Sequence, residues 1–311
     1  MPYRFFKQVV AISAYCLLAI SVIVQANAAD MNCDRQCNID VLSNYINAVI
    51  DDRPGIAPLA TNYRGTENGL TVQVGRGFWN TATGLGSVRY YFGDPVNGSA
   101  AFYGTMEEGD ATLLVSLRVK VNDGKVSEAE WVLARAGEAL VNFDGFTGSQ
   151  PSVRLLDENE QSSRLSMISA PNAYFDALQA HDPYFVVPSV EGCPRIENGT
   201  DVTRMMGAQN DGEEAVEFGF NDCTTGLESI IQIDAVVERD YLMIDQEAGV
   251  ALGRVVFHRP ENGPLRQDGS PWPRLLLTEF FTIVEGKISG IYAVMHYYSA
   301  EERPGSGSGW R

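Results

Sequence analysis

The sequence predicts an α+β protein built from two diverged copies of one unit, in which a helix comes first and an antiparallel sheet follows. The same landmarks recur in the same order in both halves of the chain. Each copy opens with apolar residues at helical spacing and continues with short β-prone runs separated by Asn-Gly and Asp-Gly turns. Helices that cover one face of an antiparallel sheet form a two-layer α+β architecture.

The first segment of the chain is predicted to lie outside this fold. Arg4 and Lys7 form a short basic start, the run from Val9 to Val24 is apolar, and Ala26-Asn27-Ala28 has the small-x-small pattern of a signal-peptidase site. The apolar run is too short for a stable membrane span. We therefore expect residues 1–28 to be a signal peptide, and the mature protein to be secreted or periplasmic and free of the membrane.

Four paired landmarks carry the duplication. In the first copy they are Asn44–Val49, Pro58-Leu59, Thr66-Glu67-Asn68-Gly69 and Asp123–Ser127. In the second copy they are Ala173–Leu178, Val187-Pro188, Ile196-Glu197-Asn198-Gly199 and Glu285–Ser289. Because Glu67 and Glu197 occur in both copies beside Asn-Gly, we interpret these segments as hairpin turns. The copies are placed at 33–135 and 165–300, with a polar linker at 136–164 and a tail at 301–311.

Each copy reads as one helix followed by several strands. In the first copy, Val41 to Val49 has helical spacing, and Asp40 or Asn38 can cap the helix. The strands of the first copy are expected at Ser87–Phe92, Ala100–Tyr103, Thr112–Val121 and Val126–Arg135. Those of the second copy are expected at Tyr241–Ile244, Val250–Phe257, Arg274–Val284 and Ile288–Tyr298. Glu261 to Pro273 is predicted to be an exposed loop.

Four cysteines remain after removal of the signal peptide. An even number in an exported chain predicts two disulfides, for which three pairings are possible. Local pairing of Cys33 with Cys37 and of Cys193 with Cys223 is favoured because each pair then lies within one copy. With three histidines and no paired Cys-x-x-Cys motif, we expect no metal site.

Charge and motif content exclude several functions. The formal net charge of −17 repels phosphate backbones and anionic lipid, so we expect no nucleic-acid partner. Gly75-Arg76-Gly77 lacks the third glycine of a dinucleotide-binding motif, and no phosphate-binding loop or nucleophile elbow occurs. Together with export, this predicts a protein that works without a cofactor.

The order of helix, Glu-Asn-Gly turn, Gly75 to Trp79, strand and Asp-Gly-Lys-Val-Ser hairpin resembles a unit of the NTF2-like (SnoaL-like) superfamily. Over residues 33 to 310 the chain also resembles an exported family of tandem NTF2-like proteins of fungi and proteobacteria. Segments that carry this resemblance are Thr66–Gly69, Gly75–Trp79, Leu117–Val121, Arg195–Gly199, Glu279–Ile283 and Ser308–Trp310. The resemblance implies two cone-shaped domains, and a glutathione-independent β-etherase activity that some members of that family possess. Because NTF2-like domains usually pair sheet to sheet, it also implies a monomer that acts as an internal pseudo-dimer.

Candidate site residues follow from the expectation of an apolar pocket in a cone. Aromatic or acidic side chains on the strands would suit a small aromatic substrate: Trp79, Tyr90, Glu130, Trp131, Tyr241 and Tyr298. Alternation aligns Glu130 with Tyr292 and Ala134 with His296, so the second copy has gained a phenol and an imidazole. His296 or His258 is the expected acid or base, with Tyr292 as hydrogen-bond partner. Asp240 is a further catalytic candidate, although an exposed ion pair with Arg239 is the simpler interpretation.

Three functions remain open at the level of sequence. The leading hypothesis is cofactor-independent acid–base cleavage of the β-aryl ether bond in a small lignin-derived aromatic compound. An isomerase, dehydratase or cyclase of the SnoaL-like type would use the same pocket. A binding protein without turnover is the third reading, favoured if both cones are filled by their own aromatic side chains.

Overall fold

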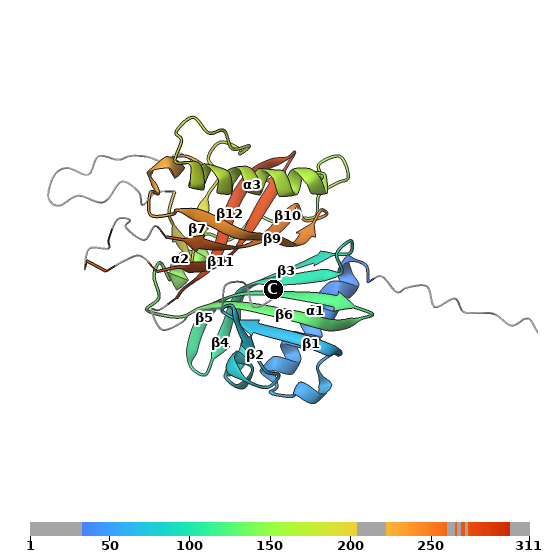
Figure 1. Cartoon of the computed structure of the whole chain (residues 1–311). Coiled ribbons are helices and arrows are strands. Elements are labelled where there is room, and N and C mark those ends of the chain that lie inside the picture. Colours follow the sequence, from blue (N-terminus) through green and yellow to red (C-terminus); the bar gives the residue numbers. More distant parts are fainter. Residues whose placement is uncertain (1–32, 204–221, 260–264, 266–268, 271–272, 299–311) are drawn as a thin grey trace, which may run out of the picture. The chain divides into compact units, whose positions relative to one another are not determined.

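The computed structural model describes residues 33–203, 222–259, 265, 269–270 and 273–298, all of which belong to one compact unit (Figure 1). The predicted signal peptide, the tail and most of the predicted loop between Glu261 and Pro273 lie outside this range. Within it, no helix is long and apolar enough to cross a membrane.

The first half of the fold, which we call repeat one, is a helix followed by a six-stranded sheet. Its helical elements are α1 (Arg35–Ile50), η1 (Pro54–Ile56) and η2 (Gly77–Asn80). Its strands are β1 (Leu59–Glu67), β2 (Leu70–Val72), β3 (Ala82–Asp94), β4 (Ser99–Glu108), β5 (Ala111–Asn122) and β6 (Lys125–Ala134). The strands are ordered β2-β1-β6-β5-β4-β3 across the sheet.

The second half, repeat two, has the same plan. Its helical elements are α3 (Arg164–Ala180) and η3 (Leu227–Ser229). Its strands are β7 (Arg195–Glu197), β8 (Thr200–Asp201), β9 (Ala235–Asp245), β10 (Val250–His258), β11 (Leu275–Val284) and β12 (Lys287–Tyr297). Their order, β8-β7-β12-β11-β10-β9, matches repeat one strand for strand and confirms the predicted class of two tandem NTF2-like α+β domains.

The sheets are mixed, which corrects the expectation of purely antiparallel strands. β1 runs parallel to β6, and β7 runs parallel to β12, while the other pairs are antiparallel. A parallel pair needs a long crossover between its strands, and here the rest of each sheet supplies it. Hairpin turns, which sequence reveals most directly, join antiparallel neighbours only.

The Asn-Gly turns have the conformation that their sequence predicts. Asn68 and Gly69 have φ of 48° and 76°, and Asn198 and Gly199 have φ of 45° and 85°. Two successive positive φ angles are typical of a type I′ hairpin, which favours Asn-Gly.

The helices begin earlier than the apolar pattern suggested. The N-cap of α1 is Asp34, whose side chain accepts a hydrogen bond from the amide of Cys37, so neither Asp40 nor Asn38 caps this helix. Asn38 lies inside the first turns and donates through Nδ2 to the carbonyl of Cys33. Ser163 caps α3 by accepting from the amide of Ser166.

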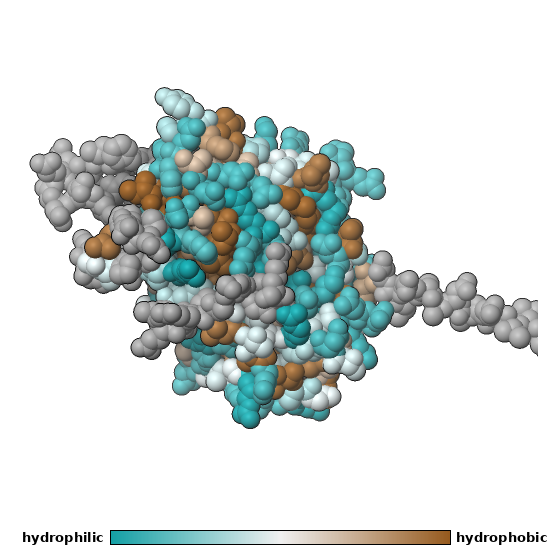
Figure 2. Space-filling model, viewed as in Figure 1, coloured by the Kyte–Doolittle hydropathy of each residue, from teal (hydrophilic) through white to brown (hydrophobic). Residues whose placement is uncertain are grey.

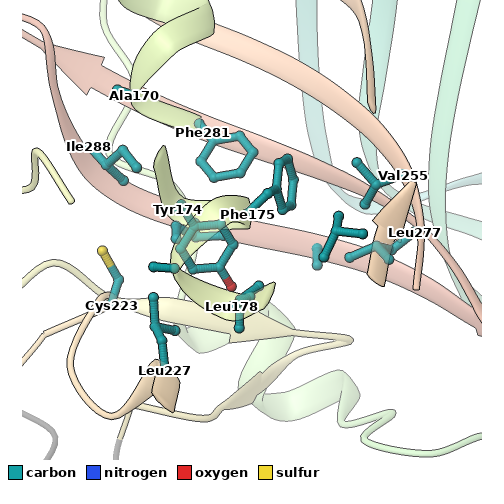
Figure 3. Close-up of a cluster of buried hydrophobic side chains, with 14 of the residues drawn as sticks. Ala170, Tyr174, Phe175, Leu178, Cys223, Leu227, Val255, Leu277, Phe281 and Ile288 are labelled. Carbon is teal, nitrogen blue, oxygen red and sulfur yellow. The ribbon is translucent and has the colours of Figure 1, made fainter. Parts of the chain in front are cut away.

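Each helix covers one face of its own sheet and encloses an apolar interior. Figure 1 shows α3 lying across the strands of its own sheet, and Figure 3 shows side chains of α3 meeting those of the strands. In repeat two, Phe175 packs edge to face on Phe281 at a centroid distance of 5.6 Å. In repeat one, Tyr45 packs edge to face on Trp79 at 5.4 Å.

The opposite faces of the two sheets meet in a third apolar cluster, which we call the inter-sheet layer. It joins buried residues of both repeats, including Phe92, Tyr103 and Val132 from repeat one and Phe280, Tyr292, Val294 and Tyr298 from repeat two. Tyr103 and Phe280 lie 5.0 Å apart between ring centroids. Both faces of each sheet are thus buried, one under a helix and one against the other sheet.

Two reciprocal ion pairs close this layer. Arg35, the first residue of α1, donates through Nε to both carboxylate oxygens of Asp245 at 3.0 and 2.8 Å. Arg164, the first residue of α3, donates through Nη1 and Nη2 to Asp94, both at 2.8 Å. Asp94 and Asp245 end equivalent strands, so the same contact occurs twice with the repeats exchanged. The two repeats therefore contact each other through two equivalent ion pairs.

The segment between the repeats contributes to the core, although a polar linker was predicted there. It contains α2 (Phe143–Gly148), and Phe146 is buried in the inter-sheet layer, 4.9 Å from the ring of Tyr103. The amide of Asn142 donates to the carbonyl of Asn198, which ties this segment to the hairpin of repeat two. Residues 136–164 hence pack as part of the fold.

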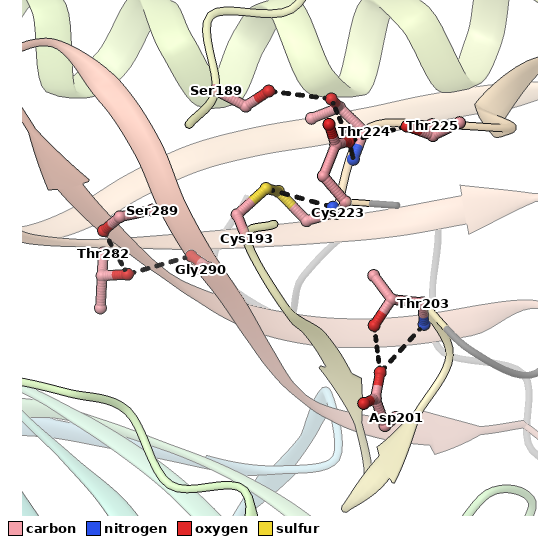
Figure 4. Close-up of a disulfide and its surroundings, with 11 residues drawn as sticks. Ser189, Cys193, Asp201, Thr203, Cys223, Thr224, Thr225, Thr282, Ser289 and Gly290 are labelled. Carbon is pink, nitrogen blue, oxygen red and sulfur yellow. Dashed lines mark hydrogen bonds between the residues drawn. A yellow bond between two sulfur atoms is a disulfide. The ribbon is translucent and has the colours of Figure 1, made fainter. Parts of the chain in front are cut away.

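The expected cysteine pairing is confirmed. Cys33 is bonded to Cys37, and Cys193 to Cys223. Figure 4 shows the second disulfide joining the start of β7 to the segment that precedes η3, where Ser189 and Thr224 are also hydrogen-bonded. Disulfides persist in oxidising compartments.

Candidate functional site in the interior of repeat two

One row of side chains crosses the inner face of each sheet, and the two rows differ in chemistry. Strand register defines the row, because directly opposed residues on neighbouring strands point to the same face. In repeat one it runs Glu67, Trp131, Leu117, Phe102 and Tyr91 across β1, β6, β5, β4 and β3. In repeat two it runs Glu197, Ala293, Glu279, Gly253 and Tyr241 across β7, β12, β11, β10 and β9.

In repeat one the row is closed by large apolar side chains. Trp131, Leu117 and Phe102 are buried together in the interior under α1. The carboxylate of Glu67 accepts a hydrogen bond from the amide of Phe78 at 2.7 Å and lies 3.7 Å from Arg135. Every position of this row is therefore filled or paired.

In repeat two the three central positions are small or acidic. Ala293 replaces the indole, Gly253 replaces the benzyl group, and Glu279 replaces Leu117. The three atoms nearest to a Cβ placed on Gly253 belong to Phe281, Tyr241 and Phe175, at ordinary contact distances of 3.6 to 3.7 Å. Glu279 is 1% exposed and belongs to β11 between Leu277 and Phe281, which both face the interior.

A second difference between the repeats also replaces an uncharged group by a charged one. In repeat one, Gly65 leaves room for the hydroxyl of Tyr63, which is hydrogen-bonded to the hydroxyl of Tyr45 at 2.8 Å. At the position of Gly65, repeat two has Arg195, which lies beside Ile291 on the inner face. Its guanidinium bonds to Tyr174, the counterpart of Tyr45, and this bond contributes to raising the pKa of Arg195. An uncharged tyrosine pair has thus become a tyrosine–arginine pair.

Burial sets the protonation of the acidic groups around Arg195. Removal from water raises the pKa of Glu279 well above its usual range, and the neighbouring Glu197 raises it further. Burial also raises the pKa of Glu197, while the charges of Arg195 and Arg259 oppose that effect. For Glu279 the opposing charge is Arg195 alone. Two carboxyl groups whose environments differ in this way can hold different protonation states.

The tyrosines at this site are kept protonated. Burial, together with the charge of Glu279, raises the pKa of Tyr174 well above its usual value, although Arg195 lowers it. The pKa of Tyr241 is also raised, mainly because its ring is largely buried. Both hydroxyls therefore remain hydrogen-bond donors at neutral pH.

Several buried polar atoms of this interior have no hydrogen-bond partner among the residues that the structure describes. They are Nε and Nη1 of Arg195, Oε2 of Glu279 and the hydroxyl of Tyr241. The nearest carboxylate oxygen to Nε of Arg195 belongs to Glu197 and is 3.6 Å away, beyond hydrogen-bond distance. Buried polar groups are nearly always paired, so a cluster of unpaired ones indicates an absent partner such as water or a ligand.

The face that carries Tyr292, His296 and Tyr298 does not line this interior. Tyr292 and Tyr298 are buried in the inter-sheet layer, and burial there raises the pKa of Tyr292 to about 12. His296 contacts Tyr298 edge to face at 5.5 Å, and its Nδ1 lies 3.1 Å from Glu138. This face of β12 packs against the other sheet, while the opposite face of β12 lies under α3. The predicted residues on it therefore do not line the interior under the helix.

Glu130 and Asp240 belong to a charge cluster that faces the same layer. Both pair with Arg254, which is 0% exposed: Nε lies 3.1 Å from Glu130 and Nη2 lies 2.5 Å from Asp240. Asp240 thus pairs with Arg254 rather than with Arg239, whose partner is Asp176. This arrangement explains both carboxylates as partners of a buried cation.

The remaining predicted residues are distributed over three places. Trp79 and Trp131 fill the interior of repeat one. Tyr90 packs on the inter-sheet layer and donates to Gln150 at 2.9 Å. His258 ends β10 and is half-buried, and burial lowers its pKa. Tyr241 is the one predicted site residue in the interior of repeat two.

Sequence reasoning therefore missed Tyr174, Arg195, Glu197 and Glu279 as site residues. The strongest available signal was Glu279, a single acid in the apolar run from Leu275 to Val284. Glu197 and Arg195 were seen only as part of a turn motif. Which face of each strand lies under the helix could not be read from alternation, since both faces are apolar.

Potential metal ligands are not clustered in the part of the chain that the structure describes. No three His, Cys, Asp or Glu side chains there are grouped so as to hold a metal ion. The outer surface is mainly hydrophilic with scattered apolar residues on the face seen in Figure 2. The interior of repeat two is consequently the chemically distinctive part of the described molecule.

Comparison with known proteins adds little about activity. The model of a domain of unknown function, DUF8021, matches residues 160–295, which run from just before α3 into β12. No curated protein matches the chain. A solved structure from Kribbella flavida DSM 17836, assigned as a ketosteroid isomerase, is 17% identical, with 38% of this chain and 93% of that chain covered and a TM-score of 0.29. The family model therefore matches most of repeat two and does not extend to repeat one.

Proposed function

We propose that repeat two is a cofactor-independent acid–base site for a small aromatic molecule, that the reaction is cleavage of an aryl ether bond, and that the protein acts outside the cytosol. The cluster of unpaired polar atoms on Arg195, Glu279 and Tyr241 carries this proposal. The aromatic rings of Tyr174, Phe175 and Phe281 supply apolar surroundings for an aromatic ring.

The two carboxyl groups suit the two proton transfers of ether hydrolysis. Glu279, protonated because burial raises its pKa, donates a proton to the ether oxygen as the bond between that oxygen and the alkyl carbon breaks. Glu197, whose ionised form the charges of Arg195 and Arg259 favour against the raising effect of burial on its pKa, takes a proton from water as the water oxygen bonds to the same carbon. The products are a phenol and an alcohol, and exchange with solvent resets both carboxyl groups.

The first experiment follows release of guaiacol from guaiacylglycerol β-guaiacyl ether by the purified protein without any cofactor. We expect release by the wild type and a loss of about 10²- to 10⁴-fold in Glu279→Gln and Glu197→Gln, the range typical of a removed acid or base. Glu67→Gln is the matched control, because it changes the equivalent glutamate of repeat one and should retain turnover.

The same assay tests the histidines. His258→Ala and His296→Ala should keep most of the turnover if the interior of repeat two is the site. Loss of turnover in a folded His→Ala variant, with retention in Glu279→Gln, would move the chemistry to the surroundings of that histidine. Absence of release from folded wild-type protein would reject ether cleavage and leave isomerisation, dehydration or binding to be tested by product analysis and ligand screening.

A further inference from the structure

The unpaired polar atoms in the interior of repeat two share one property beyond being unpaired. Nε and Nη1 of Arg195 and the hydroxyl of Tyr241 are hydrogen-bond donors. Glu279 is also a donor when protonated, which is the state that its burial favours. A site made of donors fits a partner that only accepts.

The buried positive charge of Arg195 also favours an anionic ligand. Arg195 is 2% exposed, so its positive charge is almost completely removed from water. Its ion-pair partner, Glu197, has its Oε1 3.6 Å from Nε of Arg195, and burial raises the pKa of the second carboxyl group, Glu279, which favours its neutral form. A buried cation whose ion pair is longer than a hydrogen bond is incompletely compensated, and an incoming anion would lower the cost of burying it.

The surroundings limit the anion to one on an aromatic ring. Ala293 and Gly253 separate the donors and leave the inner face of the sheet without large side chains there. The neighbours are aromatic: Tyr174 and Phe281 are 5.7 Å apart between centroids. A flat ring whose oxygen reaches Arg195 satisfies both features.

We propose that the interior of repeat two is a phenolate-binding site, in which Arg195, Tyr241 and Glu279 surround the oxyanion of a phenol. This rests on the proposed function in one respect, since a phenol, whose ionised form is the phenolate, is a product of the proposed ether cleavage. The binding itself requires no turnover and is tested separately.

The probe is 4-nitrophenol, whose phenolate absorbs visible light while the neutral phenol does not. Titration of 4-nitrophenol with and without the wild-type protein should show that the bound form ionises at lower pH than the free form. 4-Nitroanisole, which has the same ring and no ionisable oxygen, should bind far more weakly by calorimetry. Equal binding of 4-nitroanisole, or no change in ionisation on binding, would overturn the proposal.

Variants assign the effect to Arg195. Arg195→Gln should weaken phenolate binding by about ten- to a hundredfold, as expected for a lost charged hydrogen bond, and should abolish the change in ionisation. Arg195→Lys, which keeps the charge, should recover part of both. Tyr63→Phe, at the equivalent place in repeat one, should bind as the wild type does, and circular dichroism checks that each variant is folded.

Two results separate this inference from the proposed function. Phenolate binding that depends on Arg195, with no ether cleavage, would keep the site and reject the reaction. Ether cleavage with unchanged 4-nitrophenol binding in Arg195→Gln would keep the reaction and reject the phenolate site.

Discussion

The two repeats share one fold and one strand order, yet the side chains that line their interiors differ in size and charge. Repeat one closes its inner face with Trp131, Leu117 and Phe102, and pairs Tyr45 with Tyr63. At the equivalent positions repeat two has smaller, acidic or basic groups, several of them unpaired. A duplicated fold can thus keep one copy as a stable support while the other accepts polar groups that reduce stability.

The largest change in the free energy of unfolding is expected from creating a cavity in the interior of repeat one. Trp131→Ala should lower the free energy of unfolding by about 3–5 kcal/mol, because a buried indole is lost and a cavity remains. Urea unfolding followed by circular dichroism measures it. Phenolate binding in repeat two should stay unchanged at pH values where the variant is folded; loss of binding would show that the interiors are coupled.

An increase in the free energy of unfolding is expected from making the interior of repeat two apolar. Glu279→Leu gives repeat two the residue of repeat one, and should raise the free energy of unfolding by about 1–3 kcal/mol, since an unpaired buried carboxyl group is removed. The same variant should lose ether cleavage. A destabilised Glu279→Leu protein would mean that Glu279 has a structural partner in the native state.

The pH dependence of stability sharpens this second comparison. The pKa of Glu279 is raised in the folded state, so between its unfolded and folded pKa the folded protein binds more protons than the unfolded chain. The stabilisation present at low pH is lost as the pH rises through the folded pKa. Glu279→Leu should therefore show a shallower fall in unfolding free energy above about pH 4.3, the ordinary glutamate pKa.

The smallest effect is expected at the tyrosine pair of repeat one. Tyr45→Phe removes the hydrogen bond to Tyr63 and should cost about 1 kcal/mol, with turnover retained. Tyr174→Phe, the matched change in repeat two, should instead alter turnover, because its partner there is Arg195. Equal turnover in both variants would argue against a role for Tyr174.

Much of the fold could be predicted because it depends on local signals. The Asn-Gly turns at Asn68 and Asn198 follow from the positive φ angles that such turns require. The duplication was visible because these turns recur at the same places. Helix starts were less accurate, since Asp34 and Ser163 cap through side-chain hydrogen bonds that lie outside the apolar pattern.

The site could not be predicted in the same way. The candidate residues that alternation provides, such as Tyr292 and His296, do share one face of β12. Alternation does not say whether that face meets a helix or another sheet. Since both faces of β12 are buried, only the packing of the second sheet decides it.

The sequence by itself determined the two copies, their turns, the cysteine pairing and the α+β class, because each rests on residues close together in the chain or on a repeated pattern. Tertiary structure alone decided that Arg195, Glu279 and Tyr241 share one interior, because strand register across β7, β12, β11, β10 and β9 joins residues up to 96 positions apart. It also decided that Glu130 and Arg254 meet between repeats. Such contacts depend on how strands pair and how sheets pack, and neither can be inferred from local sequence patterns.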